Sequence, residues 1–573
     1  MASLAPPFRP TRIAGGGEAA AFRYLVLAIL AAAVLAPVGL IGYQSLLDGP
    51  FFDASARLGL DAWSYVLTDP DFWDALSTTA LFSVGLTALA VPLGAGLAFL
   101  LTRTDIPGAR LIEPLVLVPM FLSSIVLAFG YTVSIGPSGF VSLLLEPWLG
   151  PEPWNIYGLG GLIVIGGLSH VPHVYLYASS AMRSLPADLE EAARTTGAGL
   201  WRVAWEITLP LALPALVFAV ALNVLLGFES FGLPLVLGDP GGLLVLTTYI
   251  YKLTTLFGLP TYHLMAVVAI ILVGLTLPLV WIQRRLLGRA RRFATLGGKG
   301  ARATPLRLSR AGKLLALAAI GLWFLVAVIL PVGGITLRAF VDAWGQGVQL
   351  ADHLTLANFR QLLEVPSLLR GMINTVLIAA IGGALAVGIY LLVALAAHRW
   401  QGPGATLLDY LVLLPRALPG LVIGLAFFWL FLFVPFLTPL RPTLASLMIA
   451  YTVVGLAYGL RLIQSTLLQV APELEESART TGATIGQTWT QILAPLLRPG
   501  LVGAWTLIMI VFLREYATGV YLLSAGTEVI GSLIVSLLAT GAMDVVAALS
   551  FVSVALTAIG LGLAMRLGAR MHG

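Results

Sequence analysis

The sequence predicts an all-α integral membrane protein with twelve transmembrane helices, arranged as two parallel repeats of six. Three observations support this prediction: the composition, a series of long apolar runs and a duplicated polar motif. Of the 573 residues, 59% are hydrophobic and 10% are charged, whereas soluble domains carry about 25% charged residues. A chain this long and this apolar must place much of its surface in a bilayer. It has no cysteine, which excludes disulfides, cysteine nucleophiles and thiolate metal sites.

The apolar runs are long enough to be membrane spans, because about 20 residues at ~1.5 Å each cross ~30 Å of hydrocarbon. The first run, Tyr24 to Tyr43, is too long for the core of a signal peptide, so we expect it to be retained. The expected spans of the first set are 23–45, 75–101, 111–134, 157–181, 211–237 and 262–287, and those of the second set are 312–338, 373–397, 406–434, 443–468, 500–523 and 543–568.

The positions of the charges predict the orientation. Residues 284–313, between the two sets, are rich in Arg and Lys and contain no acidic residue, which is typical of a cytoplasmic segment. The loop after the first span is instead rich in aspartate, so we expect it outside and both termini inside. The net charge of +5 is therefore a signal of membrane topology, and we do not expect a nucleic-acid partner.

The two sets of spans are related by sequence. Residues 189–198 recur as residues 474–483, at an offset of 285 positions. Further upstream, Pro119 pairs with Pro415 at an offset of 296, so the first half contains eleven extra residues, which we expect in the outer loop from Leu143 to Gly160. Both copies of the motif follow the fourth span of their set, which predicts a parallel repeat. The expected units are a first half (1–287, motif 188–210), a basic linker (288–312) and a second half (313–573, motif 473–495).

Each copy of the motif predicts a short helix, a glycine turn and a second helix. Pro186 followed by acidic residues is a favourable helix start. Gly197 and Gly482 allow the backbone to turn in the left-handed region. Trp201 and Trp205 belong to an apolar stripe that a single loop cannot bury, which indicates a protein partner with a groove for a helix.

The motif resembles the coupling-helix signature of bacterial binding-protein-dependent ABC permeases. That signature is Glu-Glu-Ala-Ala, three further residues, a glycine, and later an Ile and a Leu-Pro. Residues 190–210 fit it closely, and residues 475–495 fit it with two departures, Ser477 and Ala494. By this resemblance, the residues that couple to the ATPase are Glu190, Glu191, Ala192, Ala193 and Gly197 in the first copy, and Glu475, Glu476, Ser477, Ala478 and Gly482 in the second.

The resemblance also implies the partners. Two copies of a cytosolic ABC ATPase would bind ATP and Mg and move the two halves, and a periplasmic or lipid-anchored binding protein would deliver the solute. The chain itself would be a multi-pass protein of the bacterial inner membrane, not an enzyme, with no cofactor and no metal site of its own. Consistent with this, the sequence has no Gly-x-x-x-x-Gly-Lys-Ser/Thr phosphate loop.

Ionisable residues at membrane depth are candidates for the translocation path, because an unpaired charge in lipid is costly. In the fifth and eleventh spans, a shift of one residue from the repeat offset pairs Glu229 with Glu515. The alternative is a structural ion pair of Arg514 with either glutamate, and His170 and His173 can equally be packing residues beside a proline. Arg416 and Arg461 are further buried charges without an assigned partner. The candidate path residues are Glu229, Phe231, Arg514, Glu515, His170 and His173.

The tails of the two halves, 235–251 and 513–541, resemble those of ferric permeases, so ferric iron is the expected solute. Thiamine, phosphonate and polyamine importers of the same mechanism are the alternatives. A secondary transporter is the alternative from a different class. It would need ion-coupling groups at the midplane and often has inverted repeats, whereas this chain has parallel repeats with cytoplasmic motifs.

Overall fold

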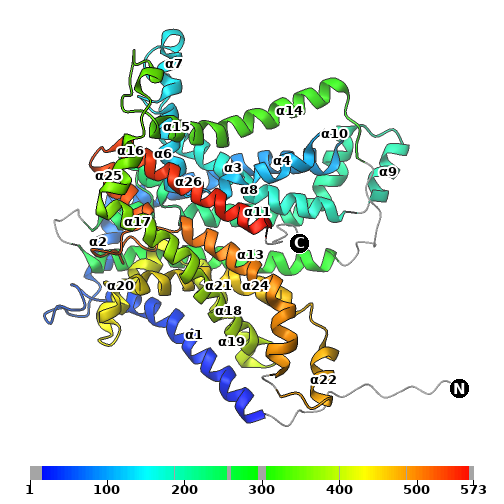
Figure 1. Ribbon diagram of the computed structural model, residues 1–573, viewed down its shortest axis with the longest axis vertical. Helices are drawn as coiled ribbons and strands as arrows, with labels where there is room; N and C mark the ends of the chain where they lie inside the picture. The colour runs from blue at the N-terminus through cyan, green and yellow to red at the C-terminus, as the bar shows by residue number, and fades with distance from the viewer. Residues whose placement is uncertain are drawn as a thin grey trace.

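The computed structural model describes residues 16–185, 187–254, 260–294, 305–398, 400–484 and 487–566, and this part of the chain is almost entirely helical (Figure 1). Within these described ranges, eleven helices are long and apolar enough to cross a membrane. A twelfth span results if Pro403–Ala417 and Gly420–Phe433, which meet at an angle of 109°, count as one. Six spans then belong to each half, as the sequence predicts.

The first half begins with a long helix and ends with another. Its helices are α1 (Gly16–Gln44), α2 (Asp61–Thr68), α3 (Pro70–Arg103), α4 (Ala109–Val116), α5 (Val118–Phe121), α6 (Ser124–Ile135), α7 (Phe140–Leu149), α8 (Leu159–Ser184), α9 (Ala187–Thr195), α10 (Leu200–Val203), α11 (Leu209–Glu229), α12 (Leu246–Lys252) and α13 (Tyr262–Ala294).

The second half repeats this order, with some helices interrupted by π-helical turns. Its helices are α14 (Arg310–Phe324), α15 (Leu330–Ala339), α16 (Ala357–Glu364), α17 (Pro366–Leu377), α18 (Gly383–Ala397), α19 (Pro403–Leu413), α20 (Gly420–Phe433), α21 (Leu444–Leu467), α22 (Pro472–Thr480), α24 (Ala494–Arg514), α25 (Ile530–Ala539) and α26 (Met543–Arg566).

The third span of each half is broken, which the sequence did not predict. In the first half the helical path is interrupted at Leu122 and Ser123, so the apolar segment expected at 111–134 becomes α4, α5 and α6. The membrane-length helical stretch there is Ser124–Leu149. In the second half the corresponding break lies at Leu418 and Pro419. Apolar content alone does not show where a span bends, because an irregular backbone is tolerated at membrane depth when protein surrounds it.

The fifth span of each half is shorter than expected. It was expected to reach 237 in the first half and 523 in the second, but α11 ends at Glu229 and α24 ends at Arg514. The apolar residues that follow are fully buried outside these α-helices: Leu237 lies in a π-helical turn, Pro234–Gly238, and Leu522 lies in a segment of turns. After each of these segments a short helix, α12 or α25, precedes the sixth span.

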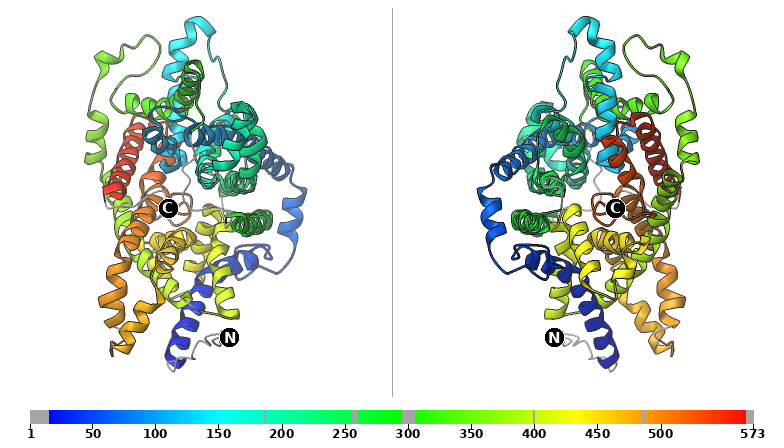
Figure 2. Two further views of the ribbon diagram at one scale, coloured as in Figure 1. Left: turned by 90° about the vertical axis from the view of Figure 1, so that its right-hand side faces the viewer. Right: turned by 90° about the vertical axis from the view of Figure 1, so that its left-hand side faces the viewer.

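The extra residues of the first half lie between α6 and α8. The starts of α6 and α20 differ by 296 positions, whereas the starts of α8 and α21 differ by 285. The additional helix α7 occupies this connection and projects from the body of the molecule (Figures 1 and 2). It lies beside the loop after α15, where the Trp344 indole donates to the Ser138 carbonyl at 2.7 Å.

The first span of each half packs against the other half. Helix α1 packs against α18, α19 and α20 of the second half as well as α13 of its own (Figures 1 and 2). Conversely, α15 packs on α6, where the Ser134 hydroxyl donates to the Leu330 carbonyl at 2.7 Å. Ile320 and Trp323 of α14 belong to the same apolar cluster as α3, α8 and α11. The two repeats are therefore interlocked.

Candidate functional site

The first motif forms a helix, a turn and a second helix at one side of the molecule (Figure 1). Helix α9 stops at a glycine turn in which the Ala198 amide donates to the Ala193 carbonyl at 3.0 Å. Gly197 adopts a φ of +87°, and a Cβ there would meet no atom within 4 Å. The turn therefore requires glycine because of its backbone conformation, not because of crowding. After it, Trp201 and Trp205 are 75% and 64% exposed.

The second motif repeats this turn. Helix α22 ends before Gly482, which has a φ of +85°, and the Ala483 amide donates to the Ala478 carbonyl at 3.0 Å. Glu476 and Ser477 are exposed. The side chain of Glu475 and the whole of Pro186 lie outside the described residues. In Figure 1, α9 and α22 lie toward the same side of the molecule and well apart from each other, one on each half.

Within the first motif, neighbouring glutamates face in different directions. Glu191 is exposed, whereas Glu190 is 4% exposed. The buried carboxylate receives the Arg103 Nε hydrogen bond at 2.9 Å and the Thr208 hydroxyl at 2.7 Å, both on Oε1. The sequence analysis assigned neither Arg103 nor Thr208. The sequence did contain one indication of the role of Arg103: it corresponds to Arg399 in the second half at the repeat offset of 296.

A cavity of about 260 Å³ lies between the two halves. It is lined by the ends of α11 and α24, by the middle of α8 and by the breaks in the two third spans. All six residues proposed for the translocation path line it, together with Arg416 and Tyr458, which the sequence analysis did not connect with them. The set is His170, His173, Glu229, Phe231, Arg514 and Glu515.

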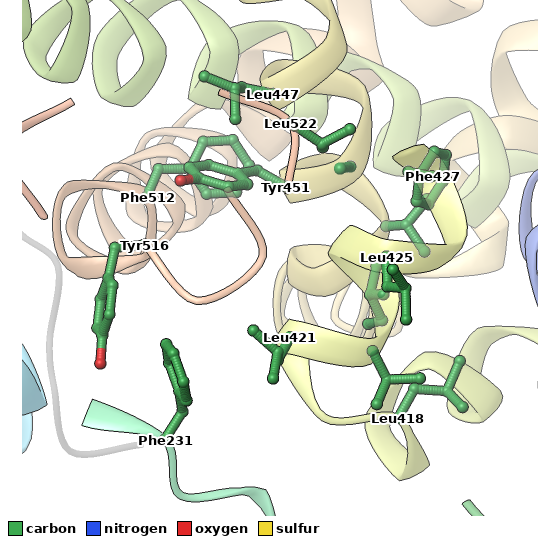
Figure 3. Packing of buried hydrophobic residues seen from close by; sticks show 14 of the residues in the cluster. Phe231, Leu418, Leu421, Leu425, Phe427, Leu447, Tyr451, Phe512, Tyr516 and Leu522 are labelled. Atoms are coloured by element: carbon green, nitrogen blue, oxygen red, sulfur yellow. The ribbon is translucent and has the colours of Figure 1, made fainter. Parts of the chain in front are cut away.

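At equivalent positions of the two repeats, an acid and a base line this cavity. Glu229 is the last residue of α11 and Arg514 is the last residue of α24, so at the offset of 285 these two correspond. The one-residue shift that paired Glu229 with Glu515 is thus wrong, because the helix ends fix the register. Phe231 and Tyr516 correspond in the same register, and their rings stack across the two halves with centroids 6.0 Å apart (Figure 3).

The buried charges do not form the ion pair that was the structural alternative. Arg514 donates to the Met120 carbonyl, across the halves. Glu515 Oε1 accepts from the Thr518 amide and hydroxyl, each at 3.0 Å. Among the described residues, none of the ion pairs within 4.0 Å involves these two residues or Glu229. Among the described residues, Glu229 Oε1 is buried without a hydrogen-bond partner, which is costly for a polar group.

Arg416, Arg461 and His170 have hydrogen-bond partners within their own half, whereas His173 Nδ1 is buried without a partner among the described residues. Arg416 Nη1 donates to the Tyr458 hydroxyl at 2.5 Å, and Arg461 Nη1 donates to Gln464 Oε1 at 3.1 Å. Arg461 was expected to be buried, but the structure places it on an exposed part of α21. His170 Nδ1 lies 2.7 Å from the Gly166 carbonyl, and the rings of His170 and His173 are 5.5 Å apart. The part of the chain that the structure describes holds no group of three His, Cys, Asp or Glu residues placed to bind a metal ion.

Comparison with known proteins gives a consistent picture. The family described as "Binding-protein-dependent transport system inner membrane component" matches residues 90–292 and 389–573. A putative ferric transport system permease protein of Haemophilus influenzae is 26% identical over 492 residues, covering 84% of this chain and 74% of that protein. A ferric transport system permease protein of Actinobacillus pleuropneumoniae is 27% identical over 446 residues, or 76% of this chain and 62% of that protein. The molybdenum transport system permease protein of Escherichia coli K12 is 33% identical over 171 residues, or 29% of this chain and 72% of that protein.

Proposed function

The chain belongs to the family of binding-protein-dependent transport system inner membrane components, and from this premise we propose that its two halves form the solute path of an ATP-driven importer. The observation that carries the proposal is the pair of matched motifs, α9 with Gly197 and α22 with Gly482, on the same side of two repeated bundles. Each motif presents a short polar helix followed by a left-handed turn, a shape suited to a groove in a partner protein.

The coupling works through these two helices. We assign α9 and α22 as the contacts for two cytosolic ATPase subunits, which bind ATP and Mg. When the two ATPases approach each other, the two motifs move toward each other. The halves then reorient around the core that they share on the side of the membrane opposite the motifs. A binding protein delivers the solute to that opposite side. Residues 284–313 then face the cytoplasm of a bacterial inner membrane, as do both termini, because basic segments are retained there.

The solute passes through the cavity between the halves. Glu229, with its unpartnered oxygen, and the two histidines line a space bounded by residues of both repeats. We assign ferric iron as the solute, because two relatives that match most of this chain are named ferric permeases. A site that held the ion tightly would trap it, so the cavity provides passing contacts only.

The solute assignment is tested by ATP hydrolysis in the reconstituted complex. The complex of this chain with its ATPases is placed in liposomes, and its binding protein is added empty, loaded with ferric iron or loaded with thiamine. We expect the ferric form to stimulate hydrolysis most strongly. Stimulation by the thiamine form alone contradicts the iron assignment, and no response to any form contradicts the importer itself.

The cavity is tested by Glu229→Gln. This change keeps the shape and removes the ionisable carboxyl group, so we expect slower ferric uptake with unchanged recovery of the ATPase subunits. Arg461→Gln is the matched control, because Arg461 is exposed and bonded within its own helix. Equal uptake in the two variants contradicts a role for Glu229 in the path.

A further inference from the structure

We propose that Arg103 and Glu190 form a buried positioning pair that fixes the first coupling helix to the second span, so that movement of α9 is passed into the bundle. The inference deepens the proposed function and rests on it. It assigns Glu190, which the sequence groups with the ATPase contacts, to an internal role. Its neighbour Glu191 stays on the exposed side of the helix.

Three segments meet at one carboxylate oxygen. Arg103 is the last residue of α3, Glu190 lies in α9, and Thr208 ends the π-helical turn that leads into α11. Arg103 Nε and Nη2 lie 2.9 and 2.7 Å from Glu190 Oε1, and the Thr208 hydroxyl lies 2.7 Å from the same atom. The second span, the coupling helix and the fifth span are thus joined at a single point.

This pair differs in kind from the exposed ion pairs of the same region. The side chains of Arg103 and Glu190 are 3% and 6% exposed, whereas those of Arg202 and Glu206 are 69% and 61% exposed. An exposed pair contributes little, because water screens it and both side chains are mobile. A buried pair cannot lose one partner without leaving the other charged and desolvated. The first pair therefore resists separation when α9 is pulled, and the second does not.

The repeat supplies independent support from the sequence. At the offset of 296, Arg103 corresponds to Arg399, and at the offset of 285, Glu190 corresponds to Glu475. Both copies of the unit thus keep the arginine at the end of the second span and the glutamate in the motif, 87 residues apart in the first half and 76 apart in the second. Arg399 and the side chain of Glu475 lie outside the described residues. Thr208 corresponds to Leu493, so the hydroxyl belongs to the first half alone.

The first residues of the second half also contact the region around Arg103. The Leu306 amide donates to the Arg103 carbonyl at 2.8 Å, and the Leu308 amide donates to the Asp105 carboxylate at 2.9 Å. Lys313, at the beginning of α14, lies 2.6 Å from that carboxylate. These contacts lower the pKa of Asp105, mainly through the Leu308 amide, so the carboxylate is charged at neutral pH. Movement of α9 therefore reaches both the second span and the seventh span through residues 103–105.

The test separates coupling from docking. Arg103→Gln, Glu190→Gln and the exchanged pair Arg103→Glu with Glu190→Arg are compared with Arg360→Gln and Glu364→Gln, which break an exposed ion pair in α16, outside both coupling motifs. Each complex is reconstituted with its ATPases and ferric-loaded binding protein. ATP hydrolysis, ferric uptake and recovery of the ATPase subunits are measured. We expect the ATP used per ion imported to rise at least about fivefold in both buried single variants, the lower end of usual coupling between sites, with ATPase recovery unchanged. In the exchanged pair we expect this ratio to return part of the way to the value of the unmodified complex. In the exposed control variants we expect the ratio to stay unchanged.

Two outcomes overturn the inference. Loss of ATPase recovery in Glu190→Gln but not in Arg103→Gln shows that Glu190 contacts the ATPase directly. An unchanged ratio of ATP to imported ion in both variants shows that the pair transmits nothing. If a single variant fails to insert, the double variant Arg103→Gln with Glu190→Gln, which leaves no unpaired charge, is scored by the same ratio. Failure of the proposed function is recognised separately, because the unmodified complex would then show no coupled uptake at all.

Discussion

Gly197 and Gly482 hold the same left-handed backbone conformation, although 285 residues separate them. Neither has a neighbour that a Cβ would strike. A side chain at either position would therefore cost the energy of the left-handed backbone itself, about 1–2 kcal/mol, and more for a β-branched residue. The turn depends on glycine for its direction, and the direction sets where each coupling helix points.

We predict that Gly197→Val uncouples the importer. The strained turn lowers the fraction of molecules in which α9 is correctly placed. A strain of about 1–2 kcal/mol corresponds to a roughly 5- to 30-fold fall in that fraction, and therefore in ferric uptake. Membrane insertion should be unaffected, because the turn is exposed. Uptake and ATP hydrolysis are measured together in liposomes. Gly197→Asn is the control, since asparagine tolerates this conformation better, and equal uptake by both variants would count against the turn.

Glu528, in the loop before α25, gives a prediction about pH. The Arg370 guanidinium holds the pKa of Glu528 at about 2, below its ordinary value of 4.5. A lowered pKa means that the charged carboxylate stabilises the folded state above pH 4.5, and that this contribution fades as the pH falls toward 2. We expect the thermal midpoint to be higher than that of Arg370→Gln at about pH 6, with the difference shrinking by about pH 3. A difference that is constant with pH would contradict this linkage.

At the scale of elements, the short helices α12 and α25 begin in the same way. The Leu246 amide donates to the Thr79 hydroxyl at 2.8 Å, and the Ile530 amide donates to the Thr375 hydroxyl at 2.9 Å. Each threonine lies on the second span of its half and donates in turn to its own helix. A helix start buried in protein needs such an acceptor, because its first amides have no partner within the helix.

We predict that Thr79→Val destabilises the first half by about 1–3 kcal/mol, because it leaves the buried Leu246 amide without an acceptor. Thr375→Val should have a similar effect in the second half. The free energy of unfolding in detergent is measured by chemical denaturation. Thr79→Ser retains the hydroxyl, so its free energy of unfolding should fall only slightly. A valine variant as stable as the serine variant would show that water or another group satisfies the amide.

Elements with a strong apolar signal were predictable, and those that depend on tertiary contacts were not. The long helices α1, α3, α8, α13 and α26 lie where the apolar runs predict them. The breaks before α6 and α20 and the early ends of α11 and α24 were missed, because a buried irregular segment is as apolar as a helix. The six cavity residues were selected by their charge or chemistry at membrane depth, and the structure places them together. Arg103 was missed because it stands at a helix end, where a basic residue also fits the topology rule.

At the scale of the molecule, the exchange of first spans ties the two halves together without the linker. Helix α1 is held against the second half partly by the Tyr24 and Trp400 rings, 5.6 Å apart and edge to face. The seventh span is held against the first half by hydrogen bonds from Tyr131 and Ser134 to the carbonyls of Val326, in the π-helical turn before α15, and Leu330, the first residue of α15. None of these contacts involves residues 288–312, so they do not require a continuous chain between the halves.

We predict that the chain cut within residues 295–304 and produced as two polypeptides still assembles. The two fragments should co-purify through a tag on one of them, and should bind the ATPase when both are present. Omitting 16–44 from the first fragment should weaken the association, because α1 then no longer covers α18, α19 and α20. Fragments that associate equally well without that helix would show that the remaining interface is sufficient.

The packing of each first span on the other half also limits when this protein can finish folding during synthesis. Helix α1 leaves the ribosome first, but α20, on which it packs, ends at Phe433. At ~5–20 residues per second, about 20 to 80 s pass before that surface exists. During this time the outward side of α1 has only lipid as its neighbour, so a nascent chain arrested after the first six spans should remain open to other membrane helices and to quality-control proteases.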